Sequence, residues 1–135
     1  PPFEGLWWQE NTEGVDYARK EDMHFISMIR LPDFVTKEDF EWATQEATKK
    51  KKQDFSKVAF FPYDEGLCVQ CMHIGSYDDE PATVDLMHDY MKANGYELDI
   101  TDTRYHHEIY LSDPRKCDVS RLKTVVRHPI RKAEE

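Results

Sequence analysis

The sequence has few glycines and no long apolar run. Only five of its 135 residues are glycine, and no glycine-rich loop of the kind that cradles phosphate groups is present. The GxSxG turn that carries the nucleophile of many serine hydrolases is also missing. No stretch approaches the roughly 20 apolar residues that a helix needs to cross a bilayer. The sequence therefore gives no support for nucleotide-dependent chemistry, for a serine nucleophile or for a membrane span.

Cysteine is also scarce. Three cysteines and the lack of a secretory signal segment predict a cytoplasmic protein. Cys68 and Cys71 form a CxxC pair, but they fall in a segment with strand character, where residues three apart point to opposite faces. Cys117 lies far along the chain from this pair. We therefore expect no metal site and no bound cofactor.

Basic residues are outnumbered by acidic ones. The chain has 18 Lys and Arg against 27 Asp and Glu, which gives a net charge of -9. This sign disfavours direct binding to nucleic acid or to an anionic membrane, and it is compatible with a cationic ligand. Aromatic residues make up 13% of the chain, which is too many for a typical disordered segment. The composition predicts one globular domain with a polar surface.

The hydrophobic pattern predicts more strands than helices. A capping-box pair, Thr36 and Asp39, marks the start of one helix, and a second helix is expected over 79–94 with Leu86, Met87, Tyr90 and Met91 as its apolar stripe. A short helical turn is expected over 118–123, and strands over 6–9, 23–29, 58–63, 67–74, 104–111 and 125–130. Pro129 lacks an N–H and predicts a sheet edge. Strands that follow one another directly favour an α+β fold with an antiparallel sheet.

The strand over 104–111 carries the most informative side chains. Alternation places His106, Glu108 and Tyr110 on one face, and Ile109 and Leu111 on the other. Ile109 and Leu111 are expected to pack under the helices. Periodicity leaves two alternatives for Glu108, a solvated surface or a concave site that it shares with Tyr110.

One long motif and several shorter segments resemble a known family. The motif is RYHHEIYLSDPRK, from Arg104 to Lys116. The other segments occur in the family's order, at 4–7, 28–36, 66–70, 73–82 and 122–127. Together they resemble the stand-alone GyrI-like small-molecule-binding proteins, which are relatives of the effector-binding domains of multidrug-responsive transcription activators.

The resemblance implies a fold as well. The family's antiparallel sheet has helices on one face and is a pseudo-two-fold pair of strand-helix-strand-strand repeats. Residues 1–135 are then a single domain, in which 1–57 are the remainder of the first repeat plus an inserted helix and 58–135 are the second repeat. The opening strand and helix of the first repeat have no counterpart here. We expect a missing N-terminal segment or a homodimer partner to complete the fold.

The resemblance also implies a site. Glu108 resembles the family's central acidic residue, and Tyr110, Tyr77 and Trp7 resemble its aromatic walls, while Trp8 should point to the other face. Three functions follow: binding of small, cationic or flat aromatic compounds, hydrolysis of reactive alkylating compounds by Glu108 and Tyr110, or the effector-sensing part of a transcription regulator. A desolvated carboxyl beside aromatic rings is expected to have a raised pKa, so we predict this for Glu108.

Overall fold

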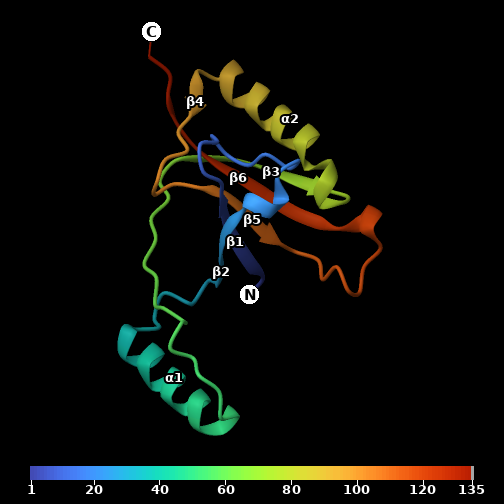
Figure 1. Cartoon of the computed structure of the whole chain (residues 1–135). Coiled ribbons are helices and arrows are strands. Elements are labelled where there is room, and N and C mark those ends of the chain that lie inside the picture. Colours follow the sequence, from blue (N-terminus) through green and yellow to red (C-terminus); the bar gives the residue numbers. More distant parts are fainter. Residues whose placement is uncertain (135) are drawn as a thin grey trace. The chain divides into compact units, whose positions relative to one another are not determined.

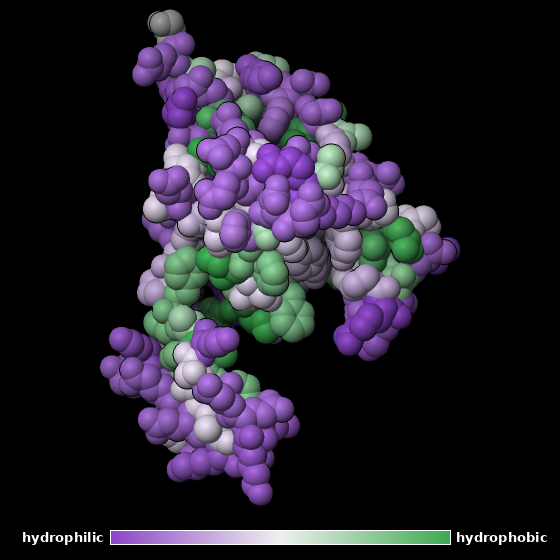
Figure 2. Space-filling model, viewed as in Figure 1, coloured by the Kyte–Doolittle hydropathy of each residue, from purple (hydrophilic) through white to green (hydrophobic). Residues whose placement is uncertain are grey.

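The computed structural model describes residues 1–134 and divides the chain into two compact units (Figure 1). The first unit comprises Pro1–Arg30 and the chain from Glu65 onward, and the second comprises Leu31–Asp64. Most of the surface visible in Figure 2 is hydrophilic, in keeping with a sequence in which 33% of residues are charged. Within the described residues, neither α-helix has the length and apolar character required to cross a bilayer.

The first unit is built on a six-stranded antiparallel sheet in the order β2-β1-β5-β6-β3, with β4 paired to β6. The strands are β1 (Phe3–Trp8), β2 (His24–Ile29), β3 (Cys68–Ile74), β4 (Tyr96–Leu98), β5 (His106–Tyr110) and β6 (Lys123–Lys132). Single turns of 3-10 helix lie at Lys20–Asp22, Tyr77–Asp79 and Val119–Arg121. The α+β fold with an antiparallel sheet is confirmed. The short strand β4 was not predicted.

Helix α2 (Glu80–Ala93) covers one face of this sheet (Figure 1). Its buried Met87 and Met91 pack against Val69, Val126 and Ile130 of β3 and β6, and these five residues form the core cluster. The predicted apolar stripe is wrong in half of its members, because Leu86 and Tyr90 are exposed. Val84, one turn before Met87, packs against the core instead.

The strand register decides which β5 residues share the face of α2. Glu108 lies opposite Val126 of β6 and Gly5 of β1, and directly opposed residues in an antiparallel pair share a face. Glu108 is therefore on the α2 side, and Ile109 is on the reverse side. The expectation that Ile109 and Leu111 pack under the helices is wrong, since Leu111 is exposed just beyond the end of β5.

Two further strand predictions are wrong. Residues 58–63 form no strand. Their aromatic rings contact other rings of the second unit: Phe60 is tilted against Phe40, and Phe61 stacks on Tyr63. Pro129 is not at an edge, because β6 has neighbours on both sides. Pairing with β5 ends at Arg127 and pairing with β4 begins at Ile130, so the missing N–H of proline falls between the two partners.

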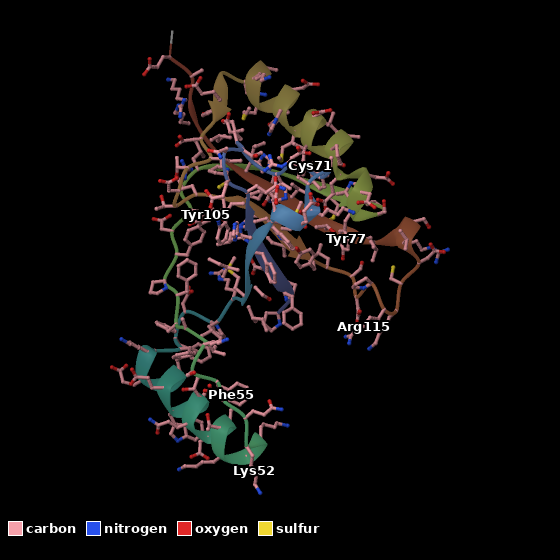
Figure 3. The ribbon with its side chains drawn as sticks, viewed as in Figure 1. Lys52, Phe55, Cys71, Tyr77, Tyr105 and Arg115 are labelled. Carbon is pink, nitrogen blue, oxygen red and sulfur yellow. The ribbon has the colours of Figure 1, made fainter. Side chains whose placement is uncertain are left out.

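The CxxC pair behaves as expected. Both cysteines lie on β3, three residues apart, and Cys71 packs against the core cluster beneath α2 (Figure 3). Cys68 is directed to the reverse face, where its Sγ contacts the Glu65 carbonyl oxygen. The prediction that the two thiols point to opposite faces is confirmed.

The second unit contains helix α1 (Lys37–Lys51). The predicted capping box is confirmed, since the Thr36 side chain accepts from the Asp39 N–H and the Asp39 side chain accepts from the Thr36 N–H. None of the residues of α1 is buried. The helix therefore depends on its caps and local contacts more than on a core of its own.

Candidate functional site

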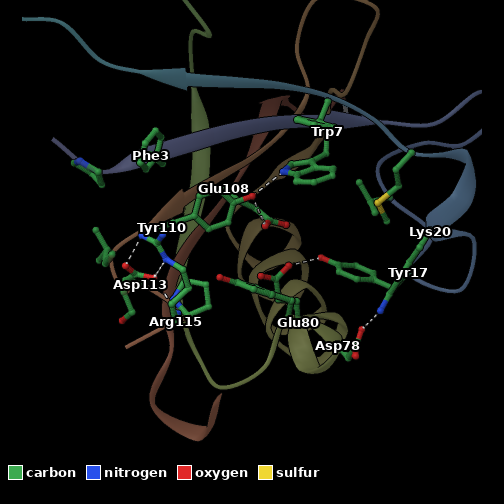
Figure 4. Close-up of a pocket in the computed structure, with 18 of the residues that line it drawn as sticks. Phe3, Trp7, Tyr17, Lys20, Asp78, Glu80, Glu108, Tyr110, Asp113 and Arg115 are labelled. Carbon is green, nitrogen blue, oxygen red and sulfur yellow. Dashed lines mark hydrogen bonds and ion pairs between the residues drawn. The ribbon is translucent and has the colours of Figure 1, made fainter. Parts of the chain in front are cut away.

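A large pocket opens beside α2 on the face of the sheet that carries Glu108 (Figure 4). Its volume is about 1170 Å³, large for a small-molecule site. Nineteen described residues line it, and most come from β1, β2, the loop between them, the start of α2, and β5 with the loop that follows. All four binding residues expected from the sequence are among them: Trp7, Tyr77, Glu108 and Tyr110.

Glu108 is held at the back of this pocket by hydrogen bonds. Its side chain accepts a bond of 2.6 Å from His106 Nε2 and one of 3.1 Å from the Tyr110 hydroxyl. The Tyr110 oxygen in turn accepts a bond of 2.8 Å from Trp7 Nε1. Glu108 is only 7% exposed, so these donors fix the direction of a largely buried carboxylate.

Gly5 makes the approach of Trp7 to Tyr110 possible. It pairs with Glu108 across the β1–β5 ladder. A Cβ atom added at Gly5 would lie 2.6 Å from Trp7 Nε1 and 3.0 Å from the Tyr110 oxygen. Any larger residue would therefore displace the indole, the phenol or both.

We expect Gly5→Ala to lower the free energy of unfolding by about 1–3 kcal/mol, the usual cost of overpacking, and to break the Trp7–Tyr110 bond. Chemical denaturation measures the loss. Trp7→Phe shortens the ring that the new methyl group meets, so the same Gly5→Ala change should cost less in that background. An equal cost in both backgrounds would show that the clash with Trp7 is not the cause.

Glu80 is a second buried acid beside Glu108 that the sequence analysis did not select. It is the first residue of α2 and is 0% exposed. Its Oε1 accepts a bond of 2.8 Å from the Tyr17 hydroxyl, whereas Oε2 is buried and has no partner if Glu80 is counted as ionised. Burial and the nearby charge of Glu108 raise the pKa of Glu80. When protonated, Glu80 can use this oxygen to donate to the Glu108 carboxylate, so that neither oxygen of Glu80 lacks a partner.

The pKa of Glu108 moves in the other direction. Burial alone would raise it, but hydrogen bonds from His106, Glu80 and Tyr110 to the carboxylate outweigh burial and lower the pKa. The expectation of a raised pKa at Glu108 is therefore wrong. The donors come from three different parts of the fold, and a desolvation argument from one strand could not include them. The pair holds one proton on Glu80 and one negative charge on Glu108.

The raised pKa of Glu80 makes stability depend on pH. Between the unfolded value, about 4.3, and the raised folded value, the folded protein binds more protons than the unfolded chain. Stability therefore falls as pH rises through this window, by up to about 1.4 kcal/mol per pH unit. Glu80→Gln stays neutral and can still donate to Glu108, so we expect it to gain stability over the wild type as pH rises. Melting curves between pH 5 and 9 test this, and parallel curves for the two proteins would contradict it.

The donor atoms of Glu80, His106 and Glu108 lie within 4.8 Å of one another, a spacing that one metal ion could bridge. Hydrogen bonds already account for this geometry. His106, Tyr110 and a protonated Glu80 all donate to the Glu108 carboxylate. We therefore assign the cluster to shared protons and do not assign it to a metal.

Aromatic rings form the sides of the pocket. Tyr77 meets Tyr110 edge to face with ring centres 6.0 Å apart, and Trp7 stacks on Phe25 at 5.1 Å. At the rim, Lys20 pairs with Asp78 and Arg115 pairs with Asp113 (Figure 4). The rim charges thus cancel in pairs, and the charge of Glu108 lies behind them among aromatic walls.

Trp8 points away from this pocket. Its ring stacks on His24 of β2 and lies 5.0 Å from the Tyr105 ring, and it alternates with Trp7 along β1. The prediction that the two tryptophans face opposite sides is confirmed. Tyr17 and Glu80 are two pocket residues, hydrogen-bonded to each other, that sequence reasoning missed. The first lies in a loop, and the second resembles an ordinary acidic residue in the first turn of a helix.

A family model and several solved structures match this chain. Residues 1–131 match the model of the GyrI-like small molecule binding domain. An uncharacterized conserved protein from Listeria innocua is 44% identical, with a TM-score of 0.90, and two structures of hydrolases from the same organism are 41% and 42% identical, each with a TM-score of 0.85. Each match covers 97% of this chain.

The chain spans 62% to 64% of the length of those three structures. No curated protein matches it. The family match extends over nearly the whole sequence and contains every residue that lines the pocket, so this chain belongs to the family of GyrI-like small molecule binding domains.

Proposed function

We propose that this chain binds small, cationic or flat aromatic compounds in the pocket, with Glu108 as the group that neutralises the cation. The observation that carries the proposal is a buried carboxylate, kept ionised by hydrogen bonds, behind the aromatic rings of Trp7, Tyr77 and Tyr110. Aromatic faces attract cations, and a desolvated carboxylate attracts them more strongly than an exposed one.

The charge balance of the pocket supports a cation over an anion. Glu80 is neutral when protonated, and the charged rim residues are paired with one another. The charge available to a ligand inside the pocket is then that of Glu108. An anionic ligand would have to approach this charge without a buried cation to offset it, which low local dielectric makes costly.

The organisation of the chain is also part of the proposal. We assign 58–135 to the second family repeat, since β3, α2, β5 and β6 occur in the order strand, helix, strand and strand, with only the short β4 between α2 and β5. We assign 1–57 to the remainder of the first repeat with its inserted helix. Exposed Phe3 and Phe25 on the pocket face support a further wall from an additional segment or from a homodimer partner. All three cysteines are unpaired, which supports a reducing, cytoplasmic location.

A binding screen tests the proposed function. The full chain is titrated by calorimetry with pairs of planar aromatic compounds that differ only in a quaternary ammonium group or its neutral carbon counterpart. Consistently tighter binding of the cationic member supports the proposal. No preference across several pairs would overturn it.

Hydrolysis is a second candidate, favoured by the pair of acids with opposite pKa shifts. Sites that separate the protonation states of two neighbouring carboxyls are typical of acid–base catalysis. Two of the similar structures are hydrolases from Listeria innocua. In this function Glu108 accepts a proton from water and Tyr110 donates one to the leaving atom of a reactive alkylating compound, and the proton on Glu108 then passes to Tyr110 along their hydrogen bond. Mass spectrometry of every compound that binds in the screen distinguishes turnover from binding.

A further inference from the structure

Three histidines connect Glu108 to the outer part of α2 through unbroken hydrogen bonds. His106 Nδ1 lies 2.6 Å from His128 Nε2, and His128 Nδ1 lies 2.8 Å from His88 Nε2. His106 Nε2 closes the chain with its 2.6 Å bond to Glu108. The described residues that line the pocket include none of these histidines, so the chain reaches Glu108 from behind the pocket wall.

The two inner histidines are shielded and the third is not. His106 and His128, on β5 and β6, are 1% and 2% exposed. His88, on α2, is partly exposed. Solvent can therefore exchange protons with His88 directly, but with the inner pair only through His88 or through Glu108.

One arrangement of protons satisfies the whole chain when Glu108 is ionised and the imidazoles are neutral. An ionised Glu108 can only accept, so His106 carries its proton on Nε2 and its Nδ1 is an acceptor. His128 must then donate from Nε2, which makes its own Nδ1 the acceptor for His88 Nε2. All three rings donate in the same direction, toward Glu108.

We propose that His88, His128 and His106 form a proton path between solvent and Glu108, which lets this carboxylate take up a proton and return it while a ligand fills the pocket.

The transfer balances at every step. A proton arriving at His88 Nδ1 releases the Nε2 proton of His88 to His128 Nδ1. His128 Nε2 then releases its proton to His106 Nδ1, and His106 Nε2 releases its proton to Glu108. Each ring gains one proton and loses one, remains neutral and ends as the other tautomer, while Glu108 gains one proton. The reverse sequence returns the proton from Glu108 to solvent.

The surroundings of the histidines favour concerted proton transfer through neutral rings over a protonated imidazolium as an intermediate. Burial and repulsion by His106 and His88 lower the pKa of His128 to about 2, so its ring stays neutral and carries protons by simultaneous gain and loss. The charged groups near His88 are Lys92, Asp85, Asp89 and Glu13. At the Glu108 end of the chain of histidines, the titratable groups are Glu80 and Tyr110, which lie beside Glu108. Tyr17 also lies there, and its ring meets the His106 ring edge to face.

The test measures exchange of imidazole protons with water in the full chain, without any ligand. Protein labelled with ¹⁵N-histidine reports the tautomer of each ring and the rate at which saturation passes from water to its N–H. Four proteins are compared: wild type, His88→Gln, Glu108→Gln and the double variant. Glutamine keeps a hydrogen-bonding group at either end but cannot relay a proton. His24→Gln alters an exposed histidine outside the chain and is the control.

We expect Nε2–H tautomers for His106 and His128 in the wild type. Each single variant leaves one end of the histidine chain able to exchange protons with solvent, so the N–H groups of His106 and His128 should still exchange. In the double variant both ends are blocked, and exchange at these two rings should slow by about tenfold or more. Exchange in the double variant as fast as in Glu108→Gln would overturn the path, and so would Nδ1–H tautomers at the inner rings. Amide spectra show that each variant is folded. Because no ligand is used, failure of the binding proposal leaves this result unaffected.

Discussion

Glu108→Gln should weaken binding of a cationic ligand by about 2–5 kcal/mol, the cost of removing one member of a desolvated charge pair, and should change the affinity of a neutral analogue much less. The amide keeps the shape of the side chain and can still accept from His106. It removes the negative charge of Glu108, which is the charge in the pocket that no rim residue neutralises. Calorimetry on the wild type and the variant, with a matched cationic and neutral pair, measures both losses.

Asp113→Asn is the matched control, since it removes a similar charge from a residue that lines the same pocket. Asp113 is paired with Arg115 at the rim, where an exposed ion pair contributes only about 0–1 kcal/mol. We therefore expect a small effect on both ligands. Equal losses for the cationic and neutral ligands with Glu108→Gln would mean that Glu108 shapes the pocket and does not recognise charge.

The acid pair gives this binding a pH dependence with a defined sign. A bound cation favours ionisation of Glu80, whose pKa burial and Glu108 hold high in the free protein. Binding should therefore release protons below that raised pKa, and affinity should increase as pH rises. Calorimetry in buffers of different ionisation enthalpy measures the released proton.

The strand over residues 104–111 shows how far sequence reasoning reaches. Alternation placed His106, Glu108 and Tyr110 on one face, and the structure keeps them together. Alternation could not tell which face α2 covers, because that depends on the pairing of Glu108 with Val126. The family motif supplied a concave site for Glu108, while the expectation for Ile109 and Leu111 came from hydrophobicity alone and was wrong.

The electrostatics of the site were less accessible from sequence. Glu108 receives bonds from His106, from Tyr110 and from Glu80, which is 28 positions away in the sequence. Burial of one carboxyl can be anticipated, but the sign of its pKa shift depends on which neighbour retains the proton. Tyr17 is a second example, because its hydroxyl donates to Glu80 from a loop 63 positions earlier in the sequence. Such contacts are fixed by tertiary packing, and no local pattern marks them.

Tyr110→Phe should separate binding from hydrolysis. If an alkylating compound is turned over in the pocket, loss of the Tyr110 hydroxyl should lower kcat by about 10²–10⁴-fold, the usual contribution of a positioned proton donor. Binding of an unreactive cationic analogue should lose only about 1 kcal/mol, the net value of one hydrogen bond. Burial and the charge of Glu108 raise the pKa of Tyr110, so the phenol keeps its proton and can act as a donor.

Trp7→Phe is the matched variant for this measurement. It removes the Nε1–H that donates to the Tyr110 oxygen but leaves the hydroxyl and Glu108 in place. If that bond orients the phenol, turnover should fall by less than in Tyr110→Phe, with little change in the affinity of the unreactive analogue. Equal kcat values for the wild type and Tyr110→Phe would remove Tyr110 from the chemistry. Glu108 would then have to activate water without help from the Tyr110 hydroxyl, although this hydroxyl donates a hydrogen bond to its carboxylate.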